Sequence, residues 1–333
     1  MKRLLVVMVC FCLVSVGMAH AKTEIEYVKT PEKTFRLAHA LAEGCPYDLG
    51  AKRFAQLVEV YSRGRLEVKI FPNAQLGNEV DTSKNVQLGM IDFAVVPVNN
   101  MSMWYRSVDV ATLPFIFRDR YHVEKFITGP VGKELFENYR KASGVRVLSF
   151  FEWGDRAIGT KKTLVKKPED LRGLKIRTPK NPIIIDTYQA LGATPTAIDQ
   201  GELYQALQQG LADGLESPAN GIVDMKWYDF LKCYTHVSVI FGVATIITND
   251  KVFSALPAED QAILLRAGLE AGEYQRWISA KAHVDGIDRL RKEGTEIYIV
   301  EDDTPFRESV KSVHQKYESI IGKEWIDKVK NIK

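Results

Sequence analysis

The stretch from Pro257 to Arg291 reads PAEDQAILLRAGLEAGEYQRWISAKAHVDGIDRLR, and no other part of the sequence constrains the architecture as strongly. It has no proline after its first residue, so the pattern predicts one uninterrupted helix. At 1.5 Å per residue this helix would be about 50 Å long, which exceeds the width of a small domain. A helix of that length predicts two lobes that share it. The sequence has no Pro/Ser-rich linker that would separate independent domains.

Upstream of this helix, predicted strands and helices alternate in two similar units. Helices between strands at this spacing are typical of parallel sheets with crossover connections. The sequence therefore predicts an α/β protein. The predicted strands are 34–39, 66–70, 91–97, 145–152, 174–178, 213–217, 237–241 and 245–248, and the predicted helices are 47–62, 79–88, 182–191 and 201–209.

The two units share a short motif. Residues 87–92 read QLGMID and residues 208–213 read QQGLAD, so both fit Q-x-G-x-x-D between a predicted helix and a predicted strand. A glycine directly after a helix allows the left-handed backbone conformation that ends it. The match indicates two lobes of similar construction.

The first residues fit a secretory signal peptide. Lys2 and Arg3 form a basic segment, the apolar run 4–16 follows, and the sequence AHA at 19–21 supplies the small-x-small pattern that signal peptidase cleaves after. A transmembrane anchor is the alternative, but the run is shorter than the ~20 apolar residues that a spanning helix needs. We expect cleavage after Ala21 and an exported, soluble protein.

The net charge argues against one class of function, and the cysteine content leaves two possibilities open. The chain has a formal net charge of +3, and two of these charges leave with the signal peptide, so the mature protein is close to neutral. That balance gives no support to nucleic-acid binding, and an anionic ligand would need a local positive site. Only Cys45 and Cys233 remain after cleavage. A disulfide and two buried thiols are both compatible with the sequence.

The mature sequence shows no catalytic or metal-binding motif. It contains no H-x-x-x-H pair, no G-x-S-x-G elbow, no C-x-x-C, no P-loop and no G-x-G-x-x-G. We therefore predict a protein that is not an enzyme and that needs no cofactor or metal.

A basic residue marks the candidate ligand site. Residues 173–179 read GLKIRTP, in which Leu174 and Ile176 alternate with Lys175 and Arg177 along a predicted strand. Ligands of open α/β sheets bind outside the carboxyl ends of strands, where Arg177 is expected. A guanidinium there can grip a carboxylate with two parallel hydrogen bonds. A surface ion pair is the alternative role.

Short motifs follow one another through nearly the whole mature chain. They are RLAH (36–39), GRL (64–66), FP (71–72), QLGNE (75–79), LPF (113–115), PEDLRGLKIRTP (168–179), LGATP (191–195), GELYQALQ (201–208), DG (213–214) and ESP (216–218). In these motifs the sequence resembles the DctP-type solute-binding proteins of tripartite ATP-independent periplasmic (TRAP) transporters.

The resemblance implies a two-lobed periplasmic binding protein fold (type II-like) with a hinge, and it agrees with the long helix that spans both lobes. Residues 22–153 and about 243–282 would form lobe I, and residues 154–242 and about 283–333 would form lobe II. The implied function is capture of a small organic acid in the periplasm, by a monomer, for delivery to TRAP membrane subunits. A ligand-sensing input module for a membrane receptor and a secreted hydrolase remain alternatives.

The resemblance also assigns candidate binding residues. Arg177 matches the arginine that anchors the ligand carboxylate in this family. Arg156 matches a second arginine of the cleft, and an ion pair with Asp155 or Glu152 is its alternative role. Ser217 stands where many relatives carry an asparagine that bonds the ligand, and a hydroxyl is shorter and has fewer hydrogen-bonding groups.

Further candidates come from the first lobe and from one helix start in the second. His39 ends the first strand and would line the cleft, or would be a core histidine. Glu79 begins a helix, where it would cap the helix or accept hydrogen bonds from ligand hydroxyls or an amine. Asn99 and Trp104 follow the third strand, and Trp104 could equally belong to the core. Gln200 precedes the helix 201–209.

The ligand class stays open at this point. Relatives bind dicarboxylates, uronates and other sugar acids, keto and hydroxy acids, and aromatic acids. Met101, Met103 and Trp104 allow an apolar or aromatic acid, whereas Glu79, Asn99 and Asn100 allow a polyol acid.

Overall fold

The computed structural model describes residues 27–333, and the predicted signal peptide, residues 1–21, lies outside them. Within the described part, the strands form one mixed sheet in the order β2-β1-β3-β8-β4-β7-β5-β6, with β9 beside β8. The strands are β1 (Lys33–Ala38), β2 (Leu66–Phe71), β3 (Phe93–Pro97), β4 (Val145–Thr160), β5 (Lys175–Thr178), β6 (Thr194–Ala197), β7 (Gly214–Ser217), β8 (Cys233–Asn249) and β9 (Glu296–Ile299).

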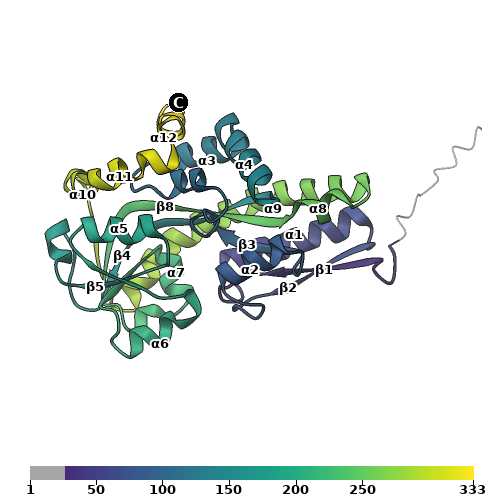
Figure 1. Ribbon diagram of the computed structural model, residues 1–333. Coiled ribbons are helices and arrows are strands. Elements are labelled where there is room, and N and C mark those ends of the chain that lie inside the picture. The colour runs from purple at the N-terminus through teal and green to yellow at the C-terminus, as the bar shows by residue number, and fades with distance from the viewer. Residues whose placement is uncertain (1–26) are drawn as a thin grey trace, which may run out of the picture.

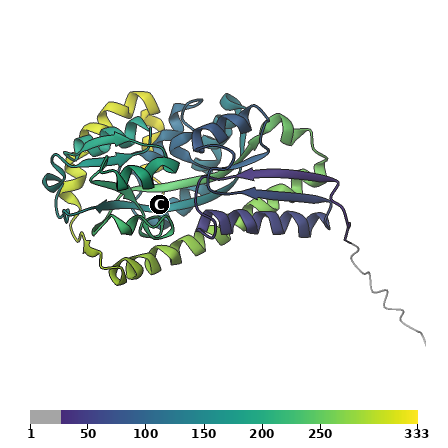
Figure 2. The same ribbon diagram turned by 90° about the horizontal axis from the view of Figure 1, so that it is seen from below.

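Helices cover both faces of this sheet: α1 and α9 lie on one face, and α3, α4 and the C-terminal helices lie on the other (Figures 1 and 2). The α-helices are α1 (Pro46–Ser62), α2 (Glu79–Gln87), α3 (Arg120–Thr128), α4 (Pro130–Ser143), α5 (Pro182–Ala190), α6 (Leu203–Gln208), α7 (Ala219–Asp224), α8 (Asp250–Ser254), α9 (Ala258–Lys292), α10 (Thr304–Ser309), α11 (Lys311–Ile321) and α12 (Lys323–Lys330). The 3₁₀ helices are η1 (Val98–Asn100), η2 (Arg106–Thr112), η3 (Pro168–Leu171), η4 (Gln200–Glu202) and η5 (Trp227–Asp229).

Two long antiparallel strands, β4 and β8, join two parallel units. At one end of the pair, β3 runs beside β8, and β1 and β2 continue the sheet; we call this end the first lobe. At the other end, β7 runs beside β4, and β5 and β6 continue the sheet; we call this end the second lobe. The parallel pairing predicted from the strand–helix alternation is confirmed within each lobe, but the connection between the lobes is antiparallel.

The prediction of two separate strands at 237–241 and 245–248 is wrong, because β8 continues through both. Gly242 lies between them, inside the continuous strand. It permits a close approach, because a Cβ at this position would lie 2.7 Å from the Cβ of Trp153 on the neighbouring strand. A glycine inside a strand is typical of such contacts.

The long helix is confirmed as α9, which spans Ala258–Lys292. It passes beneath both lobes in Figure 2. Its backbone contacts each lobe closely: a Cβ on Gly268 would lie 2.4 Å from the carbonyl oxygen of Leu148 in β4, and a Cβ on Gly286 would lie 2.8 Å from the backbone nitrogen of Asn220 in α7. The helix is thereby fixed to both halves of the molecule.

The repeated Q-x-G-x-x-D motif forms the same structure in each lobe. Gly89 and Gly210 both have positive φ, 72° and 75°, and both follow a short helix. The following aspartates each accept a hydrogen bond from a backbone N–H of the adjacent parallel strand: Asp92 Oδ2 lies 2.8 Å from the nitrogen of Arg36, and Asp213 Oδ2 lies 2.9 Å from that of Lys175. The motif therefore ends a helix and fastens the next strand to its neighbour.

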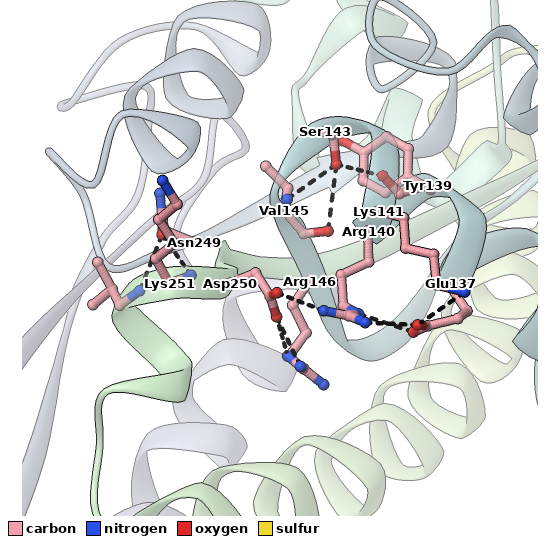
Figure 3. Close-up of polar contacts among 11 residues, drawn as sticks. Glu137, Tyr139, Arg140, Lys141, Ser143, Val145, Arg146, Asn249, Asp250 and Lys251 are labelled. Atoms are coloured by element: carbon pink, nitrogen blue, oxygen red, sulfur yellow. Dashed lines mark hydrogen bonds and ion pairs between the residues drawn. The ribbon is translucent and has the colours of Figure 1, made fainter.

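Polar contacts fix the corner where β8 leaves the sheet (Figure 3). The carboxylate of Asp250 accepts hydrogen bonds from Arg140 at 2.6 Å and from Arg146 at 2.8 Å, which ties the start of α8 to α4 and β4. Asn249 caps α8 with its side-chain oxygen. Ser143 bridges the end of α4 and the start of β4. This corner belongs to the first lobe and lies away from the site described below.

The C-terminal helices contact both halves of the molecule. α11 packs against α5 of the second lobe and against η2, and α12 also packs against η2. Arg118 donates hydrogen bonds to the carbonyl oxygens of Lys330 and Ile332, at 3.1 and 2.6 Å. The lobe boundaries given from the sequence stay a prediction, because the segment assigned to lobe II also touches residues assigned to lobe I.

Cys45 and Cys233 are both buried, and they do not form a disulfide with each other. Between residues 27 and 333, no helix is both long enough and apolar enough to cross a bilayer.

Candidate ligand-binding cleft

A cavity lies between the two lobes, beside the stretch of β4 that connects them. Its empty space, with the open mouth included, measures about 400 Å³. Its walls come from the first lobe, from β4 and from the second lobe. The lining residues are Leu41, Tyr47, Glu79, Pro97, Asn99, Trp153, Arg156, Arg177, Pro179, Gln200, Glu216, Ser217 and Trp227.

Arg177 is rigidly held and keeps its outer nitrogens free. Its strand β5 lies between β6 and β7, and the residue is 4% exposed. Its Nε donates a hydrogen bond to the carbonyl oxygen of Ile198 at 2.9 Å. Nη1 lies 3.9 Å from Glu216 Oε1, beyond hydrogen-bond reach. Neither Nη atom has a hydrogen-bond partner in the part of the chain that the structure describes, so both can grip a carboxylate.

Arg156, in contrast, already has an anionic partner. Its Nε and Nη2 donate to the two carboxylate oxygens of Glu216, with 2.5 Å between Nη2 and Oε1, and both residues are buried. Its Nη1 donates to Asn99 Oδ1 at 3.2 Å, which links β4 to the first lobe. A buried ion pair of this geometry holds both side chains in one position.

The two partners suggested for Arg156 by the sequence are wrong. Glu152 pairs with Arg120 of α3, and Asp155 accepts a hydrogen bond from Ser238 at 2.5 Å. The register of β4 against β8 shifts on both sides of Arg156, between 152 and 154 and between 156 and 158. Asp155 points away from Arg156 because adjacent residues of a strand face opposite sides. The bulge between 152 and 154 turns Glu152 to a different face from Arg156 as well.

A chain of polar side chains continues from Arg156 to Glu79. Asn99 Nδ2 donates to Asn100 Oδ1 at 3.1 Å, and Asn100 Nδ2 donates to Glu79 Oε2 at 2.7 Å. Glu79 is the first residue of α2, but the cap of this helix is Asn78, whose side chain accepts from two backbone N–H groups. The carboxylate of Glu79 therefore belongs to the cavity wall and is not the cap of α2.

Burial decides the protonation of these groups. It lowers the pKa of Arg177 to about 10 against the attraction of Glu216, so the guanidinium stays charged at neutral pH. For Arg156 burial acts in the same direction, but the attraction of Glu216 outweighs it and the pKa is raised. Burial also raises the pKa of Glu79, against the attraction of Arg177 and Arg156. It raises the pKa of Tyr47 as well, so this hydroxyl stays neutral.

Four buried polar atoms at the cavity wall have no hydrogen-bond partner among residues 27–333. They are the hydroxyl of Tyr47, Nε2 of Gln200, Oγ of Ser217 and Nε1 of Trp227. Buried polar groups are almost always paired, and each unpaired one costs about 1–3 kcal/mol. A ligand rich in oxygen atoms would give a partner to those of the four that it reaches.

Most of the predicted binding residues come together at this cavity, although their contact with a ligand stays a prediction. The residues that line it are Arg177, Arg156, Ser217, Glu79, Asn99 and Gln200.

The structure corrects the placement of two candidates, His39 and Trp104, which do not line the cavity. His39 is 1% exposed and its Nε2 lies 3.3 Å from Asp48 Oδ1, which is the core role named as its alternative. Trp104 packs against the apolar core, edge-on to Tyr139 at 6.5 Å between ring centroids.

Several lining residues were not predicted. Glu216 is the first residue of the quoted motif ESP (216–218), and Trp153 lies three residues before the candidate Arg156, so both had a signal that could have found them. Tyr47 and Trp227 gave no such signal, because the first reads as an ordinary helix start and the second lies in η5, far from any motif.

The comparison with known proteins identifies the family. Residues 37–320 match the model of the DctP family, described as bacterial extracellular solute-binding protein, family 7. The chain belongs to this family. The family predicted from the sequence motifs is thereby confirmed.

Individual relatives agree with this assignment. The 2,3-diketo-L-gulonate-binding periplasmic protein of Escherichia coli is 29% identical, over 80% of each chain. The C4-dicarboxylate-binding periplasmic protein of Rhodobacter capsulatus is 28% identical, over 89% of each chain. A TRAP periplasmic solute-binding protein from Polaromonas sp. JS666, solved with bound D-erythronate, is 27% identical and superimposes with a TM-score of 0.87 over 90% of this chain and 99% of that one. The two-lobed fold of the DctP family is confirmed with it.

Proposed function

We propose that this DctP-family protein captures a small organic acid between its lobes and delivers it to the membrane subunits of a TRAP transporter. The observation that carries the proposal is the guanidinium of Arg177, buried at the wall of the cavity with both outer nitrogens unbonded among the described residues. The relatives named above bind 2,3-diketo-L-gulonate, C4-dicarboxylates and D-erythronate, all of which are carboxylates. Membership in a family of binding proteins gives no support to the hydrolase alternative.

The proposed mechanism is capture by closure of the lobes. A carboxylate first binds Arg177 on the second lobe, and residues of the first lobe such as Tyr47 then cover it. Closure excludes water and lowers the local dielectric constant, which strengthens the ion pair. Two contacts between the lobes support the closed arrangement: Arg156 donates to the side chain of Asn99 at 3.2 Å, and Asn181 donates to the carbonyl oxygen of Asn99 at 2.8 Å.

We also propose that the protein reaches the periplasm by means of residues 1–21, which fit a signal peptide cleaved after Ala21. The two curated relatives named above are both periplasmic proteins, which supports this location.

Replacement of Arg177 tests the binding function. A thermal-shift screen of organic acids should first find a ligand, because a ligand at 100 times its Kd stabilises the protein by ~2.7 kcal/mol. Arg177→Ala should then weaken this ligand by roughly 10² to 10³, since it leaves a buried carboxylate unpaired at a cost of about 3–5 kcal/mol. Isothermal titration calorimetry measures the change.

The matched control is Lys175→Ala, which removes the same charge from an exposed position at the other end of β5. Its affinity should equal that of the wild type. Failure of every organic acid to bind, or wild-type affinity in Arg177→Ala, would refute the proposed function.

A further inference from the structure

We propose that Glu79 makes the cavity selective for monocarboxylates that carry hydroxyl groups, and that it excludes dicarboxylates. This inference rests on the proposed function, because it concerns the ligand of the same cavity. It is argued from the charges that line the cavity, from the position of Glu79 opposite the arginines, and from the unpaired donors.

The charges at the cavity wall leave room for one carboxylate. Among the described residues, the charged side chains that line it are Arg156, Arg177, Glu79 and Glu216. Arg156 and Glu216 neutralise each other in their ion pair. A ligand carboxylate on Arg177 balances the second guanidinium, and Glu79 then carries the one negative charge in excess. A second ligand carboxylate would add another negative charge to a site without water, where like charges are strongly unfavourable.

Glu79 reaches the cavity from the lobe that does not carry Arg177. Both arginines belong to β4 and to the second lobe, whereas Glu79 comes from the first lobe. The other first-lobe residues at the wall are Leu41, Tyr47, Pro97 and Asn99, which carry no charge. A ligand held by its carboxylate on Arg177 and covered by the first lobe therefore lies beside the one charged group that this lobe contributes to the wall.

The hydrogen bonds of Glu79 leave an acceptor for the ligand. Asn100 occupies Oε2 at 2.7 Å, and Asn78 caps the helix, so α2 does not use this carboxylate. Within residues 27–333 no group donates to Oε1. A ligand hydroxyl can donate a hydrogen bond to this oxygen, whereas a carboxylate has no proton to donate.

The unpaired donors at the cavity wall indicate a ligand that is rich in oxygen atoms. Gln200 Nε2 and Trp227 Nε1 can only donate, so they require ligand oxygens as acceptors. The hydroxyls of Tyr47 and Ser217 can either donate or accept. An apolar acid would leave all four groups unpaired. A polyhydroxy monocarboxylate has the oxygens that these groups need and the hydroxyl that Glu79 needs.

Pairs of acids that differ only in one terminal carboxylate test the inference. The probes are gluconate with glucarate and glycerate with tartronate, titrated into the full mature chain at pH 7.5 by calorimetry. The wild type should bind the monocarboxylate of at least one pair more tightly, by at least about ten-fold. Glu79→Gln keeps the shape and an acceptor oxygen, and it should reduce this preference by about ten-fold or more, mainly through tighter binding of the dicarboxylate.

The control variant is Asp81→Asn, which removes an exposed carboxylate from the first turn of the same helix. It should keep the preference of the wild type. A purely structural effect of Glu79→Gln would weaken both members of a pair equally, so the ratio of affinities separates the two cases.

The pH profile gives an independent readout. Binding of a dicarboxylate to the wild type should tighten as the pH falls from 8 to 5.5, because Glu79 must take up a proton before a second carboxylate can lie beside it. Glu79→Gln should lack this additional tightening. Monocarboxylate binding should depend on pH much less in both proteins.

The outcomes separate this inference from the proposed function. Binding that depends on Arg177 but favours the dicarboxylates, or a ratio that Glu79→Gln leaves unchanged, overturns the role of Glu79 alone. Tighter binding of an apolar acid such as benzoate than of any hydroxy acid overturns the hydroxyl requirement. If no acid binds at all, the proposed function fails together with this inference.

Discussion

Replacement of Asn181 by aspartate should make the stability of this protein depend on pH in a way that replacement by alanine does not. Asn181 is 2% exposed and serves two purposes. Its side-chain oxygen caps α5, accepting from the backbone nitrogens of Ile183 and Ile184 at 2.9 and 3.2 Å. Its nitrogen donates to the carbonyl oxygen of Asn99 at 2.8 Å and to Asp109 Oδ1 at 3.2 Å. An aspartate at this position would still cap α5, but it would place an acceptor where the amide nitrogen now donates to Asn99 and Asp109.

The pKa of Asp109 sets the pH range of the effect. Burial raises this pKa to about 6, although the hydrogen bond from Asn181 acts against the shift. Because the folded value lies above the unfolded value of about 3.9, the contribution of Asp109 to stability is present below about pH 4 and is lost as the pH rises to about 6. The loss is on the order of 3 kcal/mol and is complete above that pH. In the wild type, this group should therefore cause no further change between pH 7 and pH 8.

Both variants should lower the free energy of unfolding, but only the loss for Asn181→Asp should depend on pH. Asn181→Ala loses the cap, worth about 1 kcal/mol, and leaves two buried acceptors unpaired at about 1–3 kcal/mol each, so it should lose roughly 3–7 kcal/mol. Asn181→Asp keeps the cap. At pH 5 a proton shared with Asp109 replaces one of the two lost hydrogen bonds, and the carbonyl oxygen of Asn99 stays unpaired as it does in Asn181→Ala, so Asn181→Asp should be the more stable of the two by about 1 kcal/mol. At pH 8 the two carboxylates repel each other, and the order should reverse by about 2 kcal/mol or more.

Urea unfolding at pH 5, 6, 7 and 8, followed by circular dichroism, measures these differences. The control is the double variant Asp109→Asn/Asn181→Asp, in which an amide again faces a carboxylate with the roles exchanged. It should show no reversal between pH 5 and pH 8. An equal loss for Asn181→Asp at both pH values, or a double variant as pH-dependent as the single one, would refute the reasoning.

Two further predictions concern the packing of α9 and the cleavage of the predicted signal peptide. Gly268→Ala should lower the free energy of unfolding by about 1–3 kcal/mol despite the helix preference of alanine, because its Cβ would lie 2.4 Å from the carbonyl oxygen of Leu148. Gly201→Ala, with no atom within 4 Å of its Cβ, should have no such effect in urea unfolding, and equal losses would contradict the packing argument. Protein recovered from the periplasm should have the intact mass of a chain that begins at Lys22, and a mass that includes residues 1–21 would contradict the proposed cleavage.

The features that could be predicted from the sequence are those set by local patterns. The helix at 257–291 was correct to within one residue at each end, because its length depends only on the absence of helix breakers. The repeated motif was informative because Gly89 and Gly210 each need a left-handed conformation in the same local setting. Arg177 could be placed because alternation along a strand and the proline after it locate the carboxyl end of β5.

The features that could not be predicted depend on residues far apart in sequence. Arg156 and Glu216 are 60 residues apart, and only the pairing of β4 with β7 brings them together. Local pattern instead suggested the neighbours of Arg156 as its partners, but the alternation along β4 and its bulge between 152 and 154 turn those neighbours elsewhere. The continuity of β8 through 242–244 could not be predicted for the same reason, since the close contact of Gly242 is with Trp153 on another strand.

The same arrangement explains why closure should depend on the ligand. The outer nitrogens of Arg177 and four polar atoms at the cavity wall have no partner among the described residues. In the open form water can bond to them, so closure without a ligand costs about 1–3 kcal/mol for each group that loses its water. An organic acid removes this cost by supplying the missing partners, and its affinity is therefore greater for the closed form than for the open one. Because a ligand shifts a conformational equilibrium only by its difference in affinity for the two states, the unpaired groups are what couple binding to closure.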